Sequence, residues 1–143
     1  MKSSSRKKQI LRQADKLAES RDHWIEKNSF FYKNDHSYMQ FLVGDGKRIL
    51  ELGCGTGQLL NALNPSYGVG VDISANMVSV AQQNYSDLDF IHGDLEDKNL
   101  ISSLQGPFDF IILSDTIGYL EDCENAFAGL HSLCTPDTRL IIS

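Results

Sequence analysis

The sequence has little cysteine and no clustered histidine. Its three cysteines, Cys54, Cys123 and Cys134, are an odd number, and none of them belongs to a Cys-x-x-Cys pair. This argues against a disulfide framework and a cysteine-based zinc site. The four histidines are scattered along the chain, so no metal cluster is predicted. We expect reduced thiols and no metal ion.

Long apolar runs are also missing. No stretch approaches the roughly 20 apolar residues that a membrane-spanning helix needs. Residues 1–12 are polar and basic, without the apolar segment of a secretory signal. These absences predict a cytoplasmic chain with no membrane span. The length of 143 residues fits one domain.

Charge is unevenly distributed. Residues 1–28 carry eight Lys and Arg against four Asp and Glu, whereas the remainder carries five against fifteen. An acidic body disfavours a nucleic acid as partner, because the phosphate backbone needs cations. It suits a cationic ligand, although the charges could also serve only as solvated surface.

The hydrophobic pattern predicts a helical start followed by alternating strands and helices. Residues 1–6 should be disordered, and a helix should cover residues 7–27. An aromatic cluster at 29–32 and a polar break at 33–35 should precede a short helix at 38–42. The expected strands are 48–52, 68–73, 89–93, 108–113 and 139–142. The expected helices are 58–63, 75–84 and 124–134, and residues 95–104 should hold a turn or a short helix.

This alternation predicts a doubly wound α/β fold. Right-handed βαβ units give a mostly parallel sheet, and continuous apolar strands imply helices on both of its faces. We divide the chain into an N-terminal helical extension and cap, residues 1–46, and a sheet domain, residues 47–143.

A glycine-rich turn follows the first expected strand. Gly53, Gly55 and Gly57 alternate within the segment 51–57, ELGCGTG. Such spacing lets the backbone touch a ligand, whereas a plain turn needs only one glycine. A dinucleotide fingerprint would need glycine at position 58, which is Gln58, and no P-loop Gly-Lys-Ser/Thr follows.

Three further loops leave the carboxyl ends of expected strands, where open α/β sheets bind ligands. Asp72 lies 19 residues after Gly53, a separation at which a carboxylate reaches the ribose of a nucleoside cofactor. Asp94 could accept a hydrogen bond from an adenine amino group, with Leu95 packed on the ring. The loop that begins at Ser114 could line the space beside the reactive end of such a cofactor.

These segments together resemble the class I S-adenosylmethionine-dependent methyltransferases, which have a Rossmann-like fold. Residues 49–57 are similar to the first motif of that family, 69–74 to the second, 90–94 to the third and 108–114 to the fourth. The resemblance runs from about Lys47 to the end of the chain. It implies S-adenosylmethionine as cofactor and S-adenosylhomocysteine as product.

The resemblance also implies roles for individual residues. Glu51 would organise the loop and the amino-acid end of the cofactor, and Asp72 would hold the ribose. Other residues would contact the methionine portion, the adenine and the sulfur end of the cofactor. The residues expected to bind the cofactor are Glu51, Gly53, Cys54, Gly55, Gly57, Asp72, Ile73, Met77, Asp94, Leu95 and Ser114.

The acceptor half is less well specified. The family sheet normally has seven strands, whereas this sequence ends within the fifth, as a fragment or a minimal version. Residues 22–32 resemble methyltransferase domains found beside sugar-transferring domains of bacteria, which suggests a small-molecule or saccharide-type acceptor. By location alone, the candidates for a catalytic base are Asp115, Tyr119, His36 and Tyr32.

Two alternatives remain open. The chain could be a non-catalytic module that binds S-adenosylmethionine, as an accessory part of a larger, glycosyltransferase-linked protein. It could also be a nicotinamide-dependent dehydrogenase of related fold, which Gln58 disfavours. The oligomeric state is not predicted.

Overall fold

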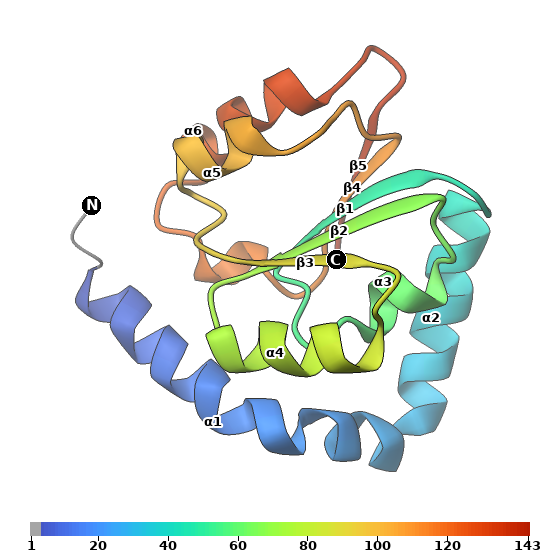
Figure 1. The fold of residues 1–143 in the computed structure, drawn as a ribbon, viewed down its shortest axis with the longest axis vertical. Coiled ribbons are helices and arrows are strands. Elements are labelled where there is room, and N and C mark those ends of the chain that lie inside the picture. Colours follow the sequence, from blue (N-terminus) through green and yellow to red (C-terminus); the bar gives the residue numbers. More distant parts are fainter. Residues whose placement is uncertain (1–3) are drawn as a thin grey trace.

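The computed structural model describes residues 4–143 as two long helices followed by an α/β domain (Figure 1). The strands are β1 (Arg48–Leu52), β2 (Tyr67–Asp72), β3 (Asp89–His92), β4 (Phe110–Leu113) and β5 (Arg139–Ile142). The helices are α1 (Ser5–Lys27), α2 (Ser29–Val43), α3 (Gln58–Ala62), α4 (Ala75–Asn84), α5 (Lys98–Ser103) and α6 (Cys123–Gly129). Two 3₁₀ helices are η1 (Ile117–Tyr119) and η2 (Leu130–Leu133).

The five strands form one parallel sheet in the order β3-β2-β1-β4-β5. The predicted doubly wound α/β fold is therefore confirmed. The chain moves outward from β1 to β3, then returns to the other side of β1 to form β4 and β5. Strand order thus reverses between β1 and β4, and the carboxyl ends of these two strands are where this fold class binds ligands.

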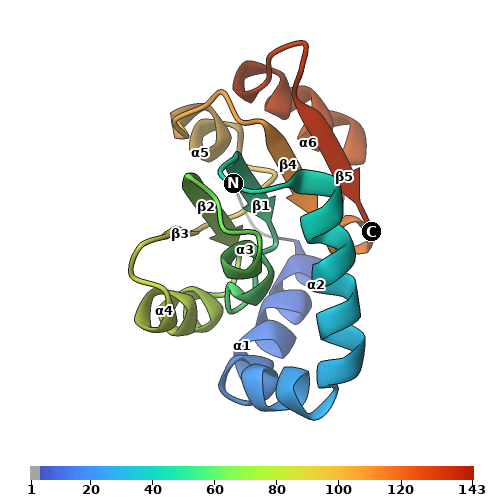
Figure 2. The same ribbon diagram turned by 90° about the vertical axis from the view of Figure 1, so that its right-hand side faces the viewer.

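Helices cover both faces of the sheet (Figure 2). On one face, Ile49 of β1 packs with Leu60 of α3 and Ala81 of α4. On the other face, the next residue, Leu50, packs with Ile101 of α5. Successive residues of a strand point to opposite faces, so the continuous apolar run in β1 fills two cores. The central strands are thus packed on both faces, and the loops at their carboxyl ends start from these buried positions.

The region before β1 differs from the prediction. A single helix, α2, runs through both the aromatic segment and the expected polar break. Met39 and Val43, which are four residues apart, bury its inner face, and His36 continues that face one turn earlier. Lys33 and Asn34 lie on the outer face. Their polarity therefore marks a solvated helix surface and not a loop.

The N-terminus also differs. Residues 1–3 lie outside the described part of the chain, so the prediction of disorder over 1–6 is tested only in its second half, where it is wrong. The side chain of Ser4 caps α1. The Arg6 guanidinium donates to the carbonyl of Gly118 at 2.8 Å. These partners come from distant segments, which local sequence could not reveal.

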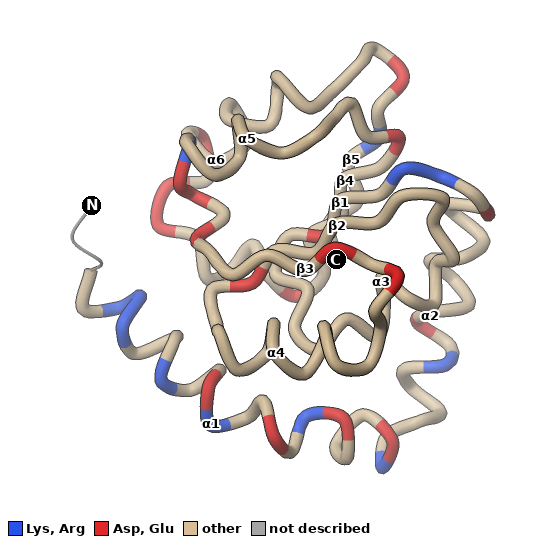
Figure 3. The backbone as a smooth tube through the Cα atoms, in the orientation of Figure 1, with Lys and Arg blue, Asp and Glu red and all other residues tan. Residues whose placement is uncertain are grey.

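Helix α1 lies beside α4 and crosses the carboxyl edge of the sheet (Figure 1). Two of its acidic side chains hold its middle part in place. The hydroxyl of Ser74 donates to Asp15, and the hydroxyl of Thr56 donates to Asp22 at 2.6 Å. Lys and Arg gather on α1, whereas Asp and Glu dominate the rest of the chain (Figure 3). The basic helix therefore covers the acidic end of the α/β domain.

The predicted helix at 124–134 is shorter than expected. α6 ends at Gly129, and η2 continues the chain in 3₁₀ geometry to Leu133. Such tightened last turns are common at helix ends. The apolar spacing that suggested one long helix is preserved, because Leu130 and Leu133 are both buried.

Candidate functional site

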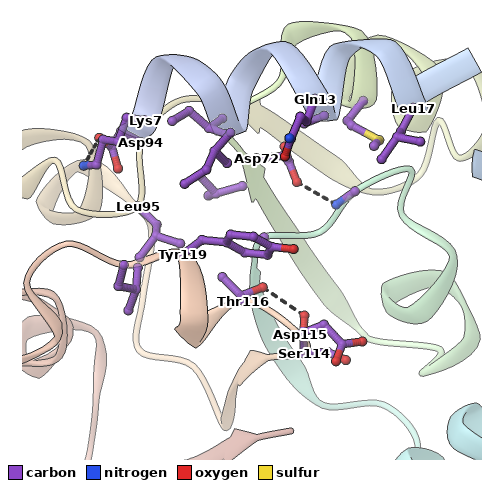
Figure 4. A pocket seen from close by; sticks show the side chains of 18 of the residues that line it. Lys7, Gln13, Leu17, Asp72, Asp94, Leu95, Ser114, Asp115, Thr116 and Tyr119 are labelled. Atoms are coloured by element: carbon purple, nitrogen blue, oxygen red, sulfur yellow. Dashed lines mark hydrogen bonds and ion pairs between the residues drawn. The ribbon is translucent and has the colours of Figure 1, made fainter. Parts of the chain in front are cut away.

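A cavity of about 280 Å³ opens at the carboxyl end of the sheet (Figure 4). Its walls are the loops after β1, β2, β3 and β4, together with one face of α1. Eight of the eleven residues expected to bind a cofactor line this first cavity: Gly53, Gly55, Asp72, Ile73, Met77, Asp94, Leu95 and Ser114. Four loops that are far apart in the sequence therefore meet at the predicted place.

The other three expected residues lie differently. Glu51 and Cys54 line a neighbouring cavity, and the Cys54 side chain is buried in the core beside Phe90. Gly57 lines neither cavity and begins α3 with φ of 86°, where an added Cβ would lie 2.6 Å from the Phe90 ring. Gly57 thus shapes the turn, whereas Gly55 faces the first cavity.

Asp72 joins two loops of the site. One carboxylate oxygen accepts from the Gly55 N–H at 2.8 Å, and the other accepts from the Ser74 N–H at 2.9 Å. Burial raises the pKa of Asp72, while these two hydrogen bonds and Arg21 act in the opposite direction. Each carboxylate oxygen has a second lone pair. Asp72 can therefore hold the glycine turn and still accept from two hydroxyls.

Asp94 is engaged by a residue that the sequence did not indicate. The Lys7 ammonium lies 2.6 Å from Asp94 and 2.8 Å from Glu96. Burial alone would lower the pKa of Lys7, but the two carboxylates raise it. Burial likewise opposes the lowered pKa of Glu96, which results from Lys7 and from backbone N–H donors. Lys7 thus fastens the start of α1 to the loop after β3.

Two buried polar side-chain atoms, one from an acidic and one from a basic residue, have no hydrogen-bond partner in the described chain. They are Oε2 of Glu51 and Nε of Arg21. Glu51 is only 3% exposed, and burial raises its pKa to about 8, although Arg21 lowers it and Asp72 raises it further. Unsatisfied buried polar groups are rare and often mark a ligand site. Arg21 was not among the residues expected to bind the cofactor.

Arg21 also explains the glycine at position 55. An added Cβ there would lie 2.9 Å from the Arg21 Nε, and the backbone has φ of 55°. The turn and the guanidinium therefore approach each other closely. Both line the first cavity, so α1 contributes a cation directly above the glycine turn.

The loop after β4 contributes polar groups on the other side of the cavity. The Thr116 hydroxyl donates to the carbonyl of Ser114 at 2.9 Å. Asp115 has φ of 52°, and its N–H donates to the carbonyl of Ser143. Tyr119, on η1, points its ring into the cavity (Figure 4). This loop is held by its own hydrogen bonds and by the end of β5.

A second cavity, of about 250 Å³, lies between α2 and the ends of β1 and β4. Of the four candidate bases, Tyr32 and Asp115 line both cavities, His36 lines only the second, and Tyr119 lines only the first. The Tyr32 and His36 rings meet edge to face, with centroids 6.4 Å apart. Burial lowers the pKa of His36, and Asp35 opposes that shift.

Two absences hold over residues 4–143. No three His, Cys, Asp or Glu side chains there are grouped so that they could hold a metal ion. No helix in that range has the length and apolarity needed to cross a bilayer.

The chain is similar to known proteins over most of its length. A family model described as a methyltransferase domain matches residues 18–143. The chain is 32% identical over 99 residues to a malonyl-[acyl-carrier protein] O-methyltransferase of Magnetococcus marinus, covering 66% of this chain and 37% of that protein. It is 30% identical over 109 residues to an uncharacterised protein of Methanocaldococcus jannaschii, covering 76% and 49%.

Solved structures share the fold. An S-adenosylmethionine-dependent methyltransferase of Thermotoga maritima superposes with a TM-score of 0.76 at 22% identity, over 93% of this chain and 60% of that chain. The DhpI–SAM–HEP complex superposes with a TM-score of 0.75 at 18% identity, over 98% and 66%. The chain spans between 26% and 49% of the length of the curated relatives it matches.

Proposed function

This chain belongs to the methyltransferase domain family, and on that premise we propose that it binds S-adenosylmethionine and transfers its methyl group to a small-molecule acceptor. The observation that carries this proposal is the pair of unpartnered buried atoms beside the glycine turn, Nε of Arg21 and Oε2 of Glu51. An amino acid carries one carboxylate and one ammonium. Arg21 can donate to the carboxylate and Glu51 can accept from the ammonium, so the two side chains fit the methionine end of the cofactor.

The remaining walls fit the nucleoside end. Asp72 would accept from the two ribose hydroxyls, since each of its oxygens retains a lone pair. Ile73, Met77 and Leu95 supply apolar surface along the same cavity for the adenine ring. Asp94 would accept from the adenine amino group while it keeps its contact with Lys7.

The other expected residues would act through the backbone. Gly53 and Gly55 leave room above the turn for the methionine portion. Cys54 would contribute only main-chain atoms there, because its side chain is in the core. Gly57 would keep the turn in shape, and Ser114 would contact the cofactor through its main chain.

Methyl transfer from this cofactor asks mainly for alignment, since the sulfonium supplies an already activated methyl group. The protein's residues hold the two reactants together, an effect that reaches roughly 7–11 kcal/mol in well-oriented systems. Residues 1–46 would act as a cap. Their helix α1 covers the cavity and is fixed by Asp15 and Asp22, so it would also keep water away.

The proposal is tested by binding and by transfer. The chain should bind S-adenosylmethionine and S-adenosylhomocysteine, and it should not bind NAD. With methyl-labelled cofactor, label should move to at least one small molecule in a panel of amines, hydroxyl compounds, saccharides and carboxylates. Binding of the cofactor without transfer to any class would indicate a non-catalytic module. Binding of NAD in preference to S-adenosylmethionine would contradict the proposal.

A further inference from the structure

Three hollows of the surface are connected through shared residues. The first and second cavities share five lining residues, namely Arg21, Tyr32, Gly53, Ser114 and Asp115. A third, shallower hollow lies between α1 and α2, and it shares four with the second cavity: Ile25, Tyr32, His36 and Gln58. Its other walls include the exposed residues Glu26, Ser29 and Lys33. The three hollows are therefore neighbours, and Tyr32 lines all of them.

The charges along the inner part of this path are mainly negative. Three carboxyl residues, Asp35, Glu51 and Asp115, line the second cavity, and Arg21 is the one Lys or Arg among its described lining residues. With Arg21 committed to the carboxylate of the cofactor and Glu51 to the ammonium, Asp35 and Asp115 remain. No cation of that lining is then free to receive an anionic acceptor, and a cation would gain from the two carboxylates.

The second cavity adjoins the proposed methionine end of the cofactor, because Glu51, which would accept from the cofactor ammonium, is among its lining residues. His36 sits at the junction with the outer hollow, on the inner face of α2. An imidazole placed there can exchange a proton with solvent on one side and with a bound molecule on the other.

We propose that the second cavity is the acceptor subsite and that it takes a small amine, which enters between α1 and α2 and gives a proton to His36. This inference rests on the proposed methyl transfer and names its substrate class. It also separates this chain from its malonyl-[acyl-carrier protein] relatives, whose names specify O-methylation.

The proton and electron balance of the step is simple. An arriving ammonium has no lone pair, so one proton passes first from nitrogen to His36. The nitrogen lone pair then forms the bond to the methyl carbon while the carbon–sulfur pair stays on sulfur. The product is a methylated ammonium, and His36 returns its proton to solvent through the outer hollow. Burial lowers the pKa of His36, so the free ring is neutral, and the carboxylate of Asp35, which opposes that shift, would stabilise the imidazolium that forms when the ring takes the proton. Tyr32 contacts the ring edge to face, and no other charged group shifts this pKa.

The test measures binding of the acceptor in the absence of methyl transfer. The imidazole NMR signals of His36, assigned with His36→Gln, are followed in the full chain saturated with S-adenosylhomocysteine. The probes are n-butylamine hydrochloride, sodium malonate and methyl glucoside, titrated under identical conditions. We expect the amine to shift the His36 signals saturably and the other two to leave them unchanged. Asp35→Asn and Asp115→Asn should each weaken amine binding at least threefold, whereas Asp137→Asn, in the distant turn before β5, should not.

Outcomes for the cofactor and for the acceptor are separate. Failure of S-adenosylhomocysteine to bind, seen by calorimetry, would overturn the proposed function itself. If that ligand binds but the amine leaves His36 unmoved, or malonate or the glucoside moves it instead, the amine inference is overturned and cofactor binding stands. Label transfer to n-butylamine that falls at least tenfold in His36→Gln, with unchanged cofactor affinity, would support the role of His36 in proton transfer.

Discussion

A carboxylate oxygen of Asp72 lies 2.8 Å from the backbone nitrogen of Gly55. This hydrogen bond joins the end of β2 to the turn after β1, so the proposed ribose acceptor and the proposed methionine cradle are fixed relative to each other. The site is therefore organised by the protein alone. Preorganisation of this kind reduces the free-energy cost of ordering groups on binding.

Asp72→Ala should weaken binding of S-adenosylmethionine by about 1.5–3 kcal/mol, or roughly 10- to 150-fold, the range for hydrogen bonds to a charged group. Calorimetric titration measures this loss. Asp137→Ala, a carboxylate in an exposed turn, is the matched control and should bind as the parent does. An unchanged affinity for Asp72→Ala would remove the ribose assignment.

Arg21→Met should weaken binding of S-adenosylmethionine by a similar factor, because the cofactor carboxylate loses its cationic partner. The same variant should bind 5′-methylthioadenosine, which lacks the amino-acid portion, as well as the parent does. Comparing the two ligands in this one variant isolates the contribution of the amino-acid portion of S-adenosylmethionine. Equal losses for both ligands would show that Arg21 acts on the whole cavity and not on the carboxylate.

Binding of S-adenosylmethionine beside Glu51 should release a proton to an extent that depends on pH. Its pKa of about 8 leaves the free carboxyl protonated at pH 7. A bound ammonium favours the carboxylate and lowers this pKa, so binding at pH 7 should release close to one proton. At pH 9.5 Glu51 is already ionised and the free cofactor's amino group, with an ordinary pKa of about 8, has lost its proton, so binding should take up a proton instead. Titrations in buffers of different ionisation enthalpy measure the number released. Glu51→Gln should abolish the pH 7 release, and persistence of the release would assign it to another group.

Lys7→Met should loosen the start of α1, because Asp94 and Glu96 lose their shared cation. We expect amide hydrogen exchange in the first turns of α1 to rise about two- to fivefold, as for the loss of up to about 1 kcal/mol of ion pairing. Lys8→Met is the control, since Lys8 is exposed and its neighbour carries the ion pairs. If both variants exchange alike, the ion pairs do not fasten the helix.

The parts that sequence reasoning predicted are those encoded locally. The glycine turn follows β1 directly and Asp72 is the last residue of β2, and parallel strands bring their carboxyl ends to one edge. Ser74 caps α4, its hydroxyl accepting from the Met77 N–H, as the preference for serine at this helix position indicates. Strand positions were correct within two residues because apolar runs in a doubly covered sheet are continuous.

The parts that were missed depend on how distant segments pack. Arg21 and Lys7 enter the site only because α1 crosses the sheet edge, and nothing near them in the sequence fixes that path. The break expected near Lys33 was wrong for a related reason. The packing of α2 against its neighbours, and not the polarity of Lys33, determines that the helix continues through this residue. In each case a side chain was interpreted without knowledge of the face on which it lies.

The most direct test of the account is calorimetric titration of the purified chain with S-adenosylmethionine and, separately, with S-adenosylhomocysteine. The account predicts saturable binding of both at one site per chain, in the micromolar range or tighter, and no heat with NAD. Absence of binding for both ligands, in a chain shown to be folded by its thermal transition, would contradict the central claim that this cavity holds the cofactor.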